Sequence, residues 1–130
     1  MPVIVLPDIE LYYDVGGSVD ASETLLFVHG SLGSSRWWQP VLPRLPAAWR
    51  LLAVDQRGSG RSRRPGADDD EAFYAIPRLA ADLGQFVAAV GLTDYHLVAH
   101  AFGGAVALQG IVSGLLQPHS LILVLSLIHI

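Results

Sequence analysis

The sequence predicts an α/β fold in which helices cover both faces of a mostly parallel sheet. Short apolar runs of strand length alternate with helical segments along the chain, which is the pattern of strand–helix–strand units. Several of these runs are apolar throughout, as in strands that are buried on both faces. The chain has 130 residues, which is enough for one domain with a core.

The composition excludes several classes of protein. Hydrophobic residues make up 52% and charged residues only 15%, which is typical of a globular chain. The net charge of -4 and the lack of a basic stripe argue against a nucleic-acid partner. The chain has no cysteine, which excludes disulfides, thiol catalysis and zinc–thiolate sites. We expect a cytoplasmic protein, because no signal peptide is visible and the longest apolar run is about half of a membrane span.

The strands are predicted from the apolar runs and the residues that interrupt them. Pro7 and Asp8 separate two early strands, and Gly16 and Gly17 end the second one. The predicted strands cover residues 3–6, 9–15, 24–29, 51–55, 95–99 and 121–124. Residues 56–71 are rich in glycine, arginine and aspartate and are interpreted as a solvated loop.

Three helices are predicted between these strands. Ser34 and Ser35 are candidate caps of a short helix through the two adjacent tryptophans. A long helix follows, with Pro77 in its first turn and Gly91 at its C-cap. Its apolar face recurs every three or four residues, as expected for a helix on a sheet. A third helix runs from Gly103 to about residue 115 and is rich in small residues.

The first motif with chemical meaning is His29-Gly30-Ser31, directly after a buried strand. The carboxyl ends of parallel strands are where open α/β sheets build their sites. A loop here can aim a backbone N–H at a developing oxyanion, and Gly30 permits the sharp turn. We interpret His29 itself as a packed, hydrogen-bonded structural histidine.

The second motif follows the next strand and runs from Asp55 to Ser62. Gly58 and Gly60 permit a tight, folded-back loop, and Asp55 and Arg57 are able to tie it down with charged hydrogen bonds. Loop architecture is favoured over a phosphate site, because Gly58-x-Gly60 lacks the rest of a dinucleotide fingerprint.

The third motif, residues 97–104, has the pattern of a nucleophile elbow between a strand and a helix. Ala99 and Gly103 are the small residues that the tight turn requires. The nucleophile position is occupied by Ala101, preceded by His100, and alanine has neither a hydroxyl nor a thiol with which to attack a carbonyl.

The three motifs in this order resemble the α/β-hydrolase fold superfamily, of the esterase, haloperoxidase and epoxide-hydrolase type. The resemblance implies that the backbone N–H groups of Ser31 and Phe102 form an oxyanion hole. It implies a small carbonyl-containing substrate such as an ester, amide or carbamate-like compound, with no metal or cofactor. The family's acid and histidine base come later in the chain, and nothing here matches them. We therefore interpret His96, His100 and His119 as structural or surface residues.

Three explanations of Ala101 remain open: a natural residue, an engineered replacement of serine, and a sequence error. The natural explanation is favoured, because the elbow and the earlier Asp-Gln-Arg-Gly resemble the serine-less aminoacrylate hydrolases of pyrimidine breakdown. Three functions are compatible with it: a hydrolase, a catalytically dead binding member of the fold, and serine-independent chemistry by activated water or as an oxygenase. Fold alone does not choose among them.

The sequence also predicts where native structure stops. Residues 1–124 are interpreted as the N-terminal part of one core domain, truncated after about the sixth strand. Residues 125–130 resemble the translation of a transposase adapter and are interpreted as a non-native tail. An apolar edge strand and uncovered sheet faces predict that the chain alone is poorly soluble or molten. The sequence does not indicate an oligomeric state.

Overall fold

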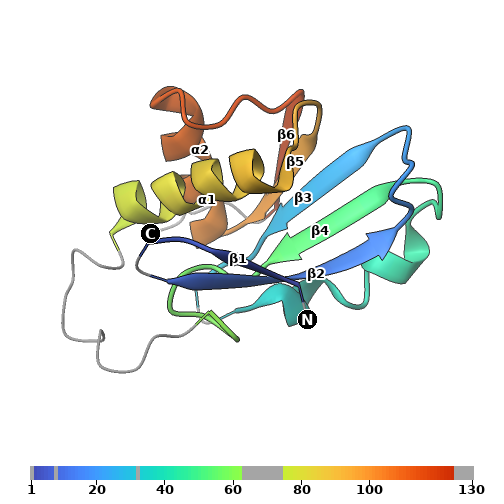
Figure 1. Cartoon of the computed structure of the whole chain (residues 1–130), viewed down its shortest axis with the longest axis horizontal. Coiled ribbons are helices and arrows are strands. Elements are labelled where there is room, and N and C mark those ends of the chain that lie inside the picture. Colours follow the sequence, from blue (N-terminus) through green and yellow to red (C-terminus); the bar gives the residue numbers. More distant parts are fainter. Residues whose placement is uncertain (1, 8, 32, 63–74, 125–130) are drawn as a thin grey trace.

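A computed structural model describes the chain except for residues 1, 8, 32, 63–74 and 125–130. The described residues contain a sheet with the strand order β1-β2-β4-β3-β5-β6 (Figure 1). The strands are β1 (Val3–Val5), β2 (Glu10–Gly17), β3 (Thr24–Val28), β4 (Arg50–Val54), β5 (His96–His100) and β6 (Ser120–Val124). Strands β4, β3, β5 and β6 are parallel, whereas β1 and β2 pair antiparallel at one edge. The predicted mostly parallel α/β sheet is confirmed.

Both α-helices pack on one face of the sheet (Figure 1). Helix α1 (Ile76–Val90) has a proline in its first turn and ends at Gly91, whose φ of 79° is the left-handed C-cap conformation. Helix α2 (Phe102–Val112) begins one residue before the predicted start and ends before the predicted end. Together the helices bury the main core, which includes Leu26, Leu52 and Leu97. No helix in the described ranges has the length and apolarity to cross a bilayer.

The other face carries two 3₁₀ helices, η1 (Ser35–Trp38) and η2 (Leu42–Arg44). Pro40, Pro43 and Pro46 prevent one long helix in this segment, because each proline removes a backbone donor. Trp38 fills a smaller core here and packs on Phe27 with ring centroids 5.0 Å apart.

The cap of η1 is one serine rather than two. Ser34 Oγ accepts the Arg36 N–H at 3.2 Å, as an N-cap does. Ser35 is inside the helix, and its N–H donates to Asp55 at 2.6 Å. The prediction of Ser35 as a second candidate cap was therefore wrong.

Strand β2 continues through the two glycines that were expected to end it. Gly16 and Gly17 pair with Leu51 and Arg50 of β4 in antiparallel register. At Gly17 φ is 69°, and a Cβ there would come within 1.7 Å of the Trp49 carbonyl oxygen. Glycine is thus required at the close approach of two backbones, and the expected strand end was wrong. The suspected tail at 125–130 and most of the predicted loop lie outside the described residues.

Candidate active site

A sharp turn joins β5 to α2. Ala101 alone makes this turn, with φ 49° and ψ −117°, and no other described non-glycine residue has a positive φ. Such a conformation costs about 1–3 kcal/mol and persists only when the surroundings impose it. Here the Ala101 N–H donates to Val124 O at 3.0 Å, and the Ala101 carbonyl accepts from Gly104 N at 2.8 Å.

Two glycines let the elbow and the loop after β3 touch. A Cβ on Gly103 would come within 2.4 Å of His29 O and 2.8 Å of Val28 O. A Cβ on Gly30 would come within 2.9 Å of His100 Nδ1 and 3.3 Å of Ala101 Cβ. The structure therefore brings the first and third motifs together around residue 101.

The two predicted oxyanion donors, Ser31 and Phe102, each adjoin a residue of this contact in the chain. Phe102 is the first residue of α2, so its N–H has no acceptor within the helix and lies at the positive end of the helix dipole. Ser31 follows Gly30, the residue that abuts Ala101, and is exposed. Phe102 thus directly follows the turn at Ala101, and Ser31 directly follows the glycine that packs against it, while their role as oxyanion donors stays a prediction.

His29 is buried beneath this loop with 1% of its surface exposed. Its Nε2 lies 3.0 Å from Gln56 N, and its Nδ1 lies 2.7 Å from Gly30 O. Burial lowers the pKa of His29 below its ordinary value, more than the hydrogen bond to Gly30 raises it. The imidazole is therefore neutral, and both of its nitrogens form hydrogen bonds with backbone groups.

The second motif forms a folded-back loop around the buried carboxylate of Asp55. Asp55 accepts from Ser35 N at 2.6 Å, from Arg61 N at 3.1 Å and from Arg61 Nε at 2.9 Å. Burial on its own would raise the pKa of Asp55, but these bonds outweigh it and hold the pKa below its ordinary value. Gly60 is needed because a Cβ there would come within 2.7 Å of the carboxylate carbon. Gly58 also takes a positive φ, of 81°.

Arg57 ties the same loop to a helix rather than to Asp55. Its Nε and Nη2 donate to the two carboxylate oxygens of Asp82 in α1, at 2.7 and 2.9 Å. Both side chains are buried, with 1% and 6% of their surface exposed. Asp82 was not predicted from the sequence. The signal was present, because an acid lies between Leu79 and Phe86 on the apolar side of the helix and requires a buried partner.

Comparison with known proteins identifies this arrangement. The model of the family described as "alpha/beta hydrolase fold" matches residues 23–109, which include all three motifs. The chain belongs to the alpha/beta hydrolase fold family. The resemblance stated from the sequence is confirmed, and the turn at Ala101 lies between a strand and a helix, where the elbow was predicted.

Relatives within the alpha/beta hydrolase family include "Putative carbamate hydrolase RutD" from Variovorax paradoxus (strain S110), which is 46% identical over 100 residues, 76% of this chain and 36% of that protein. Among solved structures, an epoxide hydrolase from hot-environment metagenomes has 28% identity and a TM-score of 0.83 over 96% of this chain and 41% of its own. The proline iminopeptidase-related protein from Thermus thermophilus has 27% identity and a TM-score of 0.81, over 94% and 42%. The chain spans about a third of the length of the curated relatives it matches.

Other histidines of this alpha/beta hydrolase chain have partners of their own. His100 stacks on Trp37, with centroids 4.8 Å apart and planes at 26°. His96 begins β5, about 13 Å from His100 at the usual strand rise. Its nitrogens contact Ser120 Oγ at 2.6 Å and Glu23 Oε2 at 2.8 Å, and neither partner belongs to the elbow. His119 Nδ1 lies 3.3 Å from Asp94 Oδ1.

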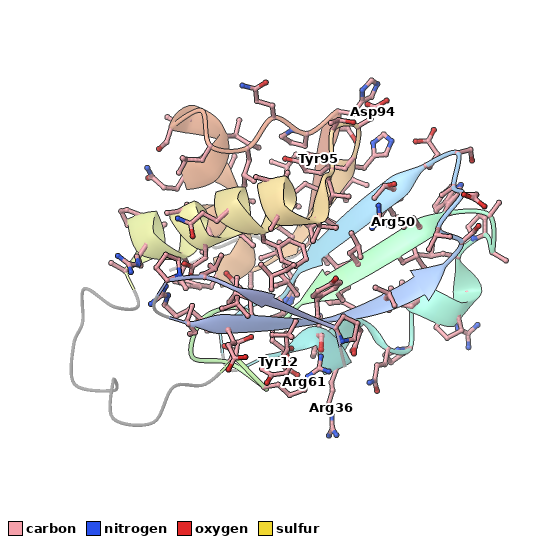
Figure 2. The ribbon with its side chains drawn as sticks, viewed as in Figure 1. Tyr12, Arg36, Arg50, Arg61, Asp94 and Tyr95 are labelled. Atoms are coloured by element: carbon pink, nitrogen blue, oxygen red, sulfur yellow. The ribbon has the colours of Figure 1, made fainter. Side chains whose placement is uncertain are left out.

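Figure 2 shows how far the His119 partner Asp94 lies from the loop that holds Arg61. Asp94 lies on the opposite side of the molecule from Arg61, which lies beside Tyr12 below the sheet. The Arg61 guanidinium is 5.9 Å from the centre of the Tyr12 ring and also pairs with Asp14 at 3.1 Å. Among the described side chains, no group of three or more His, Cys, Asp or Glu residues is placed to hold a metal ion.

Proposed function

We propose that this chain supplies the oxyanion-stabilising part of a hydrolase site for small carbonyl compounds of the ester, amide or carbamate-like class. The observation that carries the proposal is the strained turn at Ala101. This backbone costs free energy wherever glycine is absent, and it holds Ala101 against Gly30, the residue before Ser31, and directly before Phe102. Two backbone N–H donors, those of Ser31 and Phe102, match the charge of a tetrahedral intermediate.

The alanine restricts the mechanism. A methyl group forms no acyl-enzyme, so the attacking group is water activated by a base. The negative charge that develops on the substrate's carbonyl oxygen is stabilised by Ser31 N–H and Phe102 N–H. Loss of one such donor typically lowers kcat by about 10²–10³. The resemblance to the family assigns the base and acid to residues that follow this chain's motifs.

The carbamate class is favoured over other carbonyl compounds by one comparison. The relative with 46% identity is described as a carbamate hydrolase, and the match spans 76% of this chain. The elbow sequence of this chain, with alanine at 101, is compatible with hydrolysis that needs no covalent intermediate.

A decisive test begins with the source gene, sequenced through codon 101 and beyond codon 124. The encoded full-length protein is then assayed on carbamate-like, enamine and ester substrates, with Ala101→Ser as the matched variant. We expect turnover by the parent and no label on residue 101 from a fluorophosphonate probe. A serine codon at 101 would instead make the protein an ordinary serine hydrolase.

The absent hydroxyl equally favours a second function, a binding protein on a hydrolase scaffold. The two functions differ in what the rest of the gene encodes. A downstream acid and histidine with measurable turnover support the hydrolase. Ligand binding by calorimetry without turnover, together with loss of that histidine, would support the binding protein.

A further inference from the structure

The two hydrogen bonds of His29 determine which imidazole nitrogen carries the proton. The Gln56 N–H is a donor only, so His29 Nε2, 3.0 Å away, must accept and carries no hydrogen. A neutral imidazole then carries its hydrogen on Nδ1. That N–H donates to the Gly30 carbonyl oxygen at 2.7 Å.

The Gly30 carbonyl in turn determines the direction of the next N–H. The peptide between Gly30 and Ser31 is planar and trans, so its carbonyl and its N–H point in opposite directions. Two donors hold this carbonyl: His29 Nδ1–H, and Gly33 N–H at 3.1 Å. A flip of this peptide would break both hydrogen bonds. The Gly30 carbonyl oxygen would then point where the Ser31 N–H points now, away from the His29 ring.

Gln56 is itself fixed by its neighbours. Its side-chain Nε2 donates to His29 O at 2.7 Å, so it contacts His29 twice. The next residue, Arg57, is held by Asp82 of α1, and the preceding residue, Asp55, is held by Ser35 and Arg61. The contacts of Asp55 and Arg57 therefore fix the backbone on both sides of Gln56, and Gln56 fixes the His29 imidazole.

We propose that His29 is a positioning residue: Gln56 holds it in the Nδ1–H tautomer, and it aims the Ser31 N–H at the site beside Ala101. The imidazole never touches the substrate; it acts through one peptide. That this N–H serves a developing oxyanion rests on the function proposed above, whereas the tautomer and the peptide direction do not.

Two substitutions at His29 each keep one of its two hydrogen bonds and remove the other. His29→Asn places an amide donor where Nδ1 stands, so the bond to Gly30 O is kept and the bond from Gln56 is lost. His29→Gln places an amide oxygen where Nε2 stands, so the bond from Gln56 is kept and the bond to Gly30 O is lost. In the full-length protein we expect His29→Gln to lower kcat about tenfold to hundredfold with KM unchanged, and His29→Asn to remain within about threefold of the parent. Equal losses in both variants would show a merely structural histidine and overturn the proposal.

Nitrogen NMR of the parent tests the inference without activity and without a variant. We expect His29 Nδ1 to be protonated and Nε2 unprotonated, and the Ser31 amide resonance to move in His29→Gln but not in His29→Asn. A protonated Nε2, or a Ser31 amide that is unchanged in both variants, would overturn the proposal. A parent that hydrolyses nothing would overturn the proposed function alone, and the NMR result would still decide this one.

Discussion

At the scale of single residues, Gly103 and Gly104 are adjacent glycines with different surroundings. A Cβ on Gly103 would lie 2.4 Å from a backbone oxygen that cannot move aside, whereas a Cβ on Gly104 would meet only Leu123 Cδ2 at 3.1 Å. We expect Gly103→Ala to lower the free energy of unfolding by about 2–3 kcal/mol through overpacking. Gly104→Ala is the matched control and should be neutral to within about 1 kcal/mol, since alanine favours a helix. Urea unfolding measures both, and equal effects would contradict the close approach of α2 to β3.

The buried histidine gives a residue-scale prediction about pH. The pKa of His29 is lowered in the folded chain, so the unfolded chain binds a proton more readily. The stability that neutral His29 contributes is therefore complete above its unfolded pKa of about 6.5, and it is lost as the pH falls below that value toward the lower folded pKa. We expect the parent to lose more stability than His29→Asn between pH 7.5 and 5.5. Parallel curves from urea unfolding at each pH would show that His29 is not the group responsible.

At the scale of elements, α1 was predictable because its own sequence contains both boundaries. Pro77 and Gly91 act locally, through fixed dihedral angles, so no tertiary information is needed to place them. The sharp strand-to-helix turn at Ala101 was predictable for the same reason, from small residues at fixed spacing around it. The continuation of β2 through Gly17 was not predictable, because it depends on the carbonyl of Trp49, a residue distant in sequence.

The ion pair between Arg57 and Asp82 joins two elements and gives the prediction for this scale. Arg57→Leu removes the partner of the buried Asp82 carboxylate, so we expect this variant to cost about 3–5 kcal/mol. The double variant Arg57→Leu with Asp82→Leu should recover much of that loss, because it removes the buried carboxylate as well. A double-mutant cycle in urea measures this. The exposed pair of His119 and Asp94 provides the control, and Asp94→Ala should leave the unfolding midpoint almost unchanged.

At the scale of the whole molecule, the sequence predicted the sheet class but not the strand order. Parallel pairing followed from alternating strands and helices, whereas the antiparallel edge of β1 and β2 depends on register between distant segments. For the candidate site, the sequence predicted that three motifs meet at one edge of the sheet, and the structure brings them into contact. Its internal contacts were not predictable, because the partners of Arg57 and of His29 are chosen by packing.

One face of the sheet remains apolar and open in the described structure. An open cavity of about 570 Å³ is lined mainly by apolar side chains of β3, β5 and β6 and of the segment around Trp38, together with Glu23 and His96. Ile122 and Val124 line it and are 51% and 36% exposed. Because patches of this kind drive association, we expect the 130-residue chain alone to self-associate or to bind a hydrophobic dye.

Threonine substitutions on this face test the expectation, because threonine suits a strand and carries less apolar surface. Ile122→Thr with Val124→Thr should reduce dye binding and raise the monomer fraction in sedimentation, with little change in the unfolding midpoint. Leu121, on the same strand, packs against the core beneath the helices, so Leu121→Thr should instead lower stability. A parent chain that is a monomer, binds no dye and unfolds in one sharp two-state transition would contradict this expectation. The open face would then not cause association.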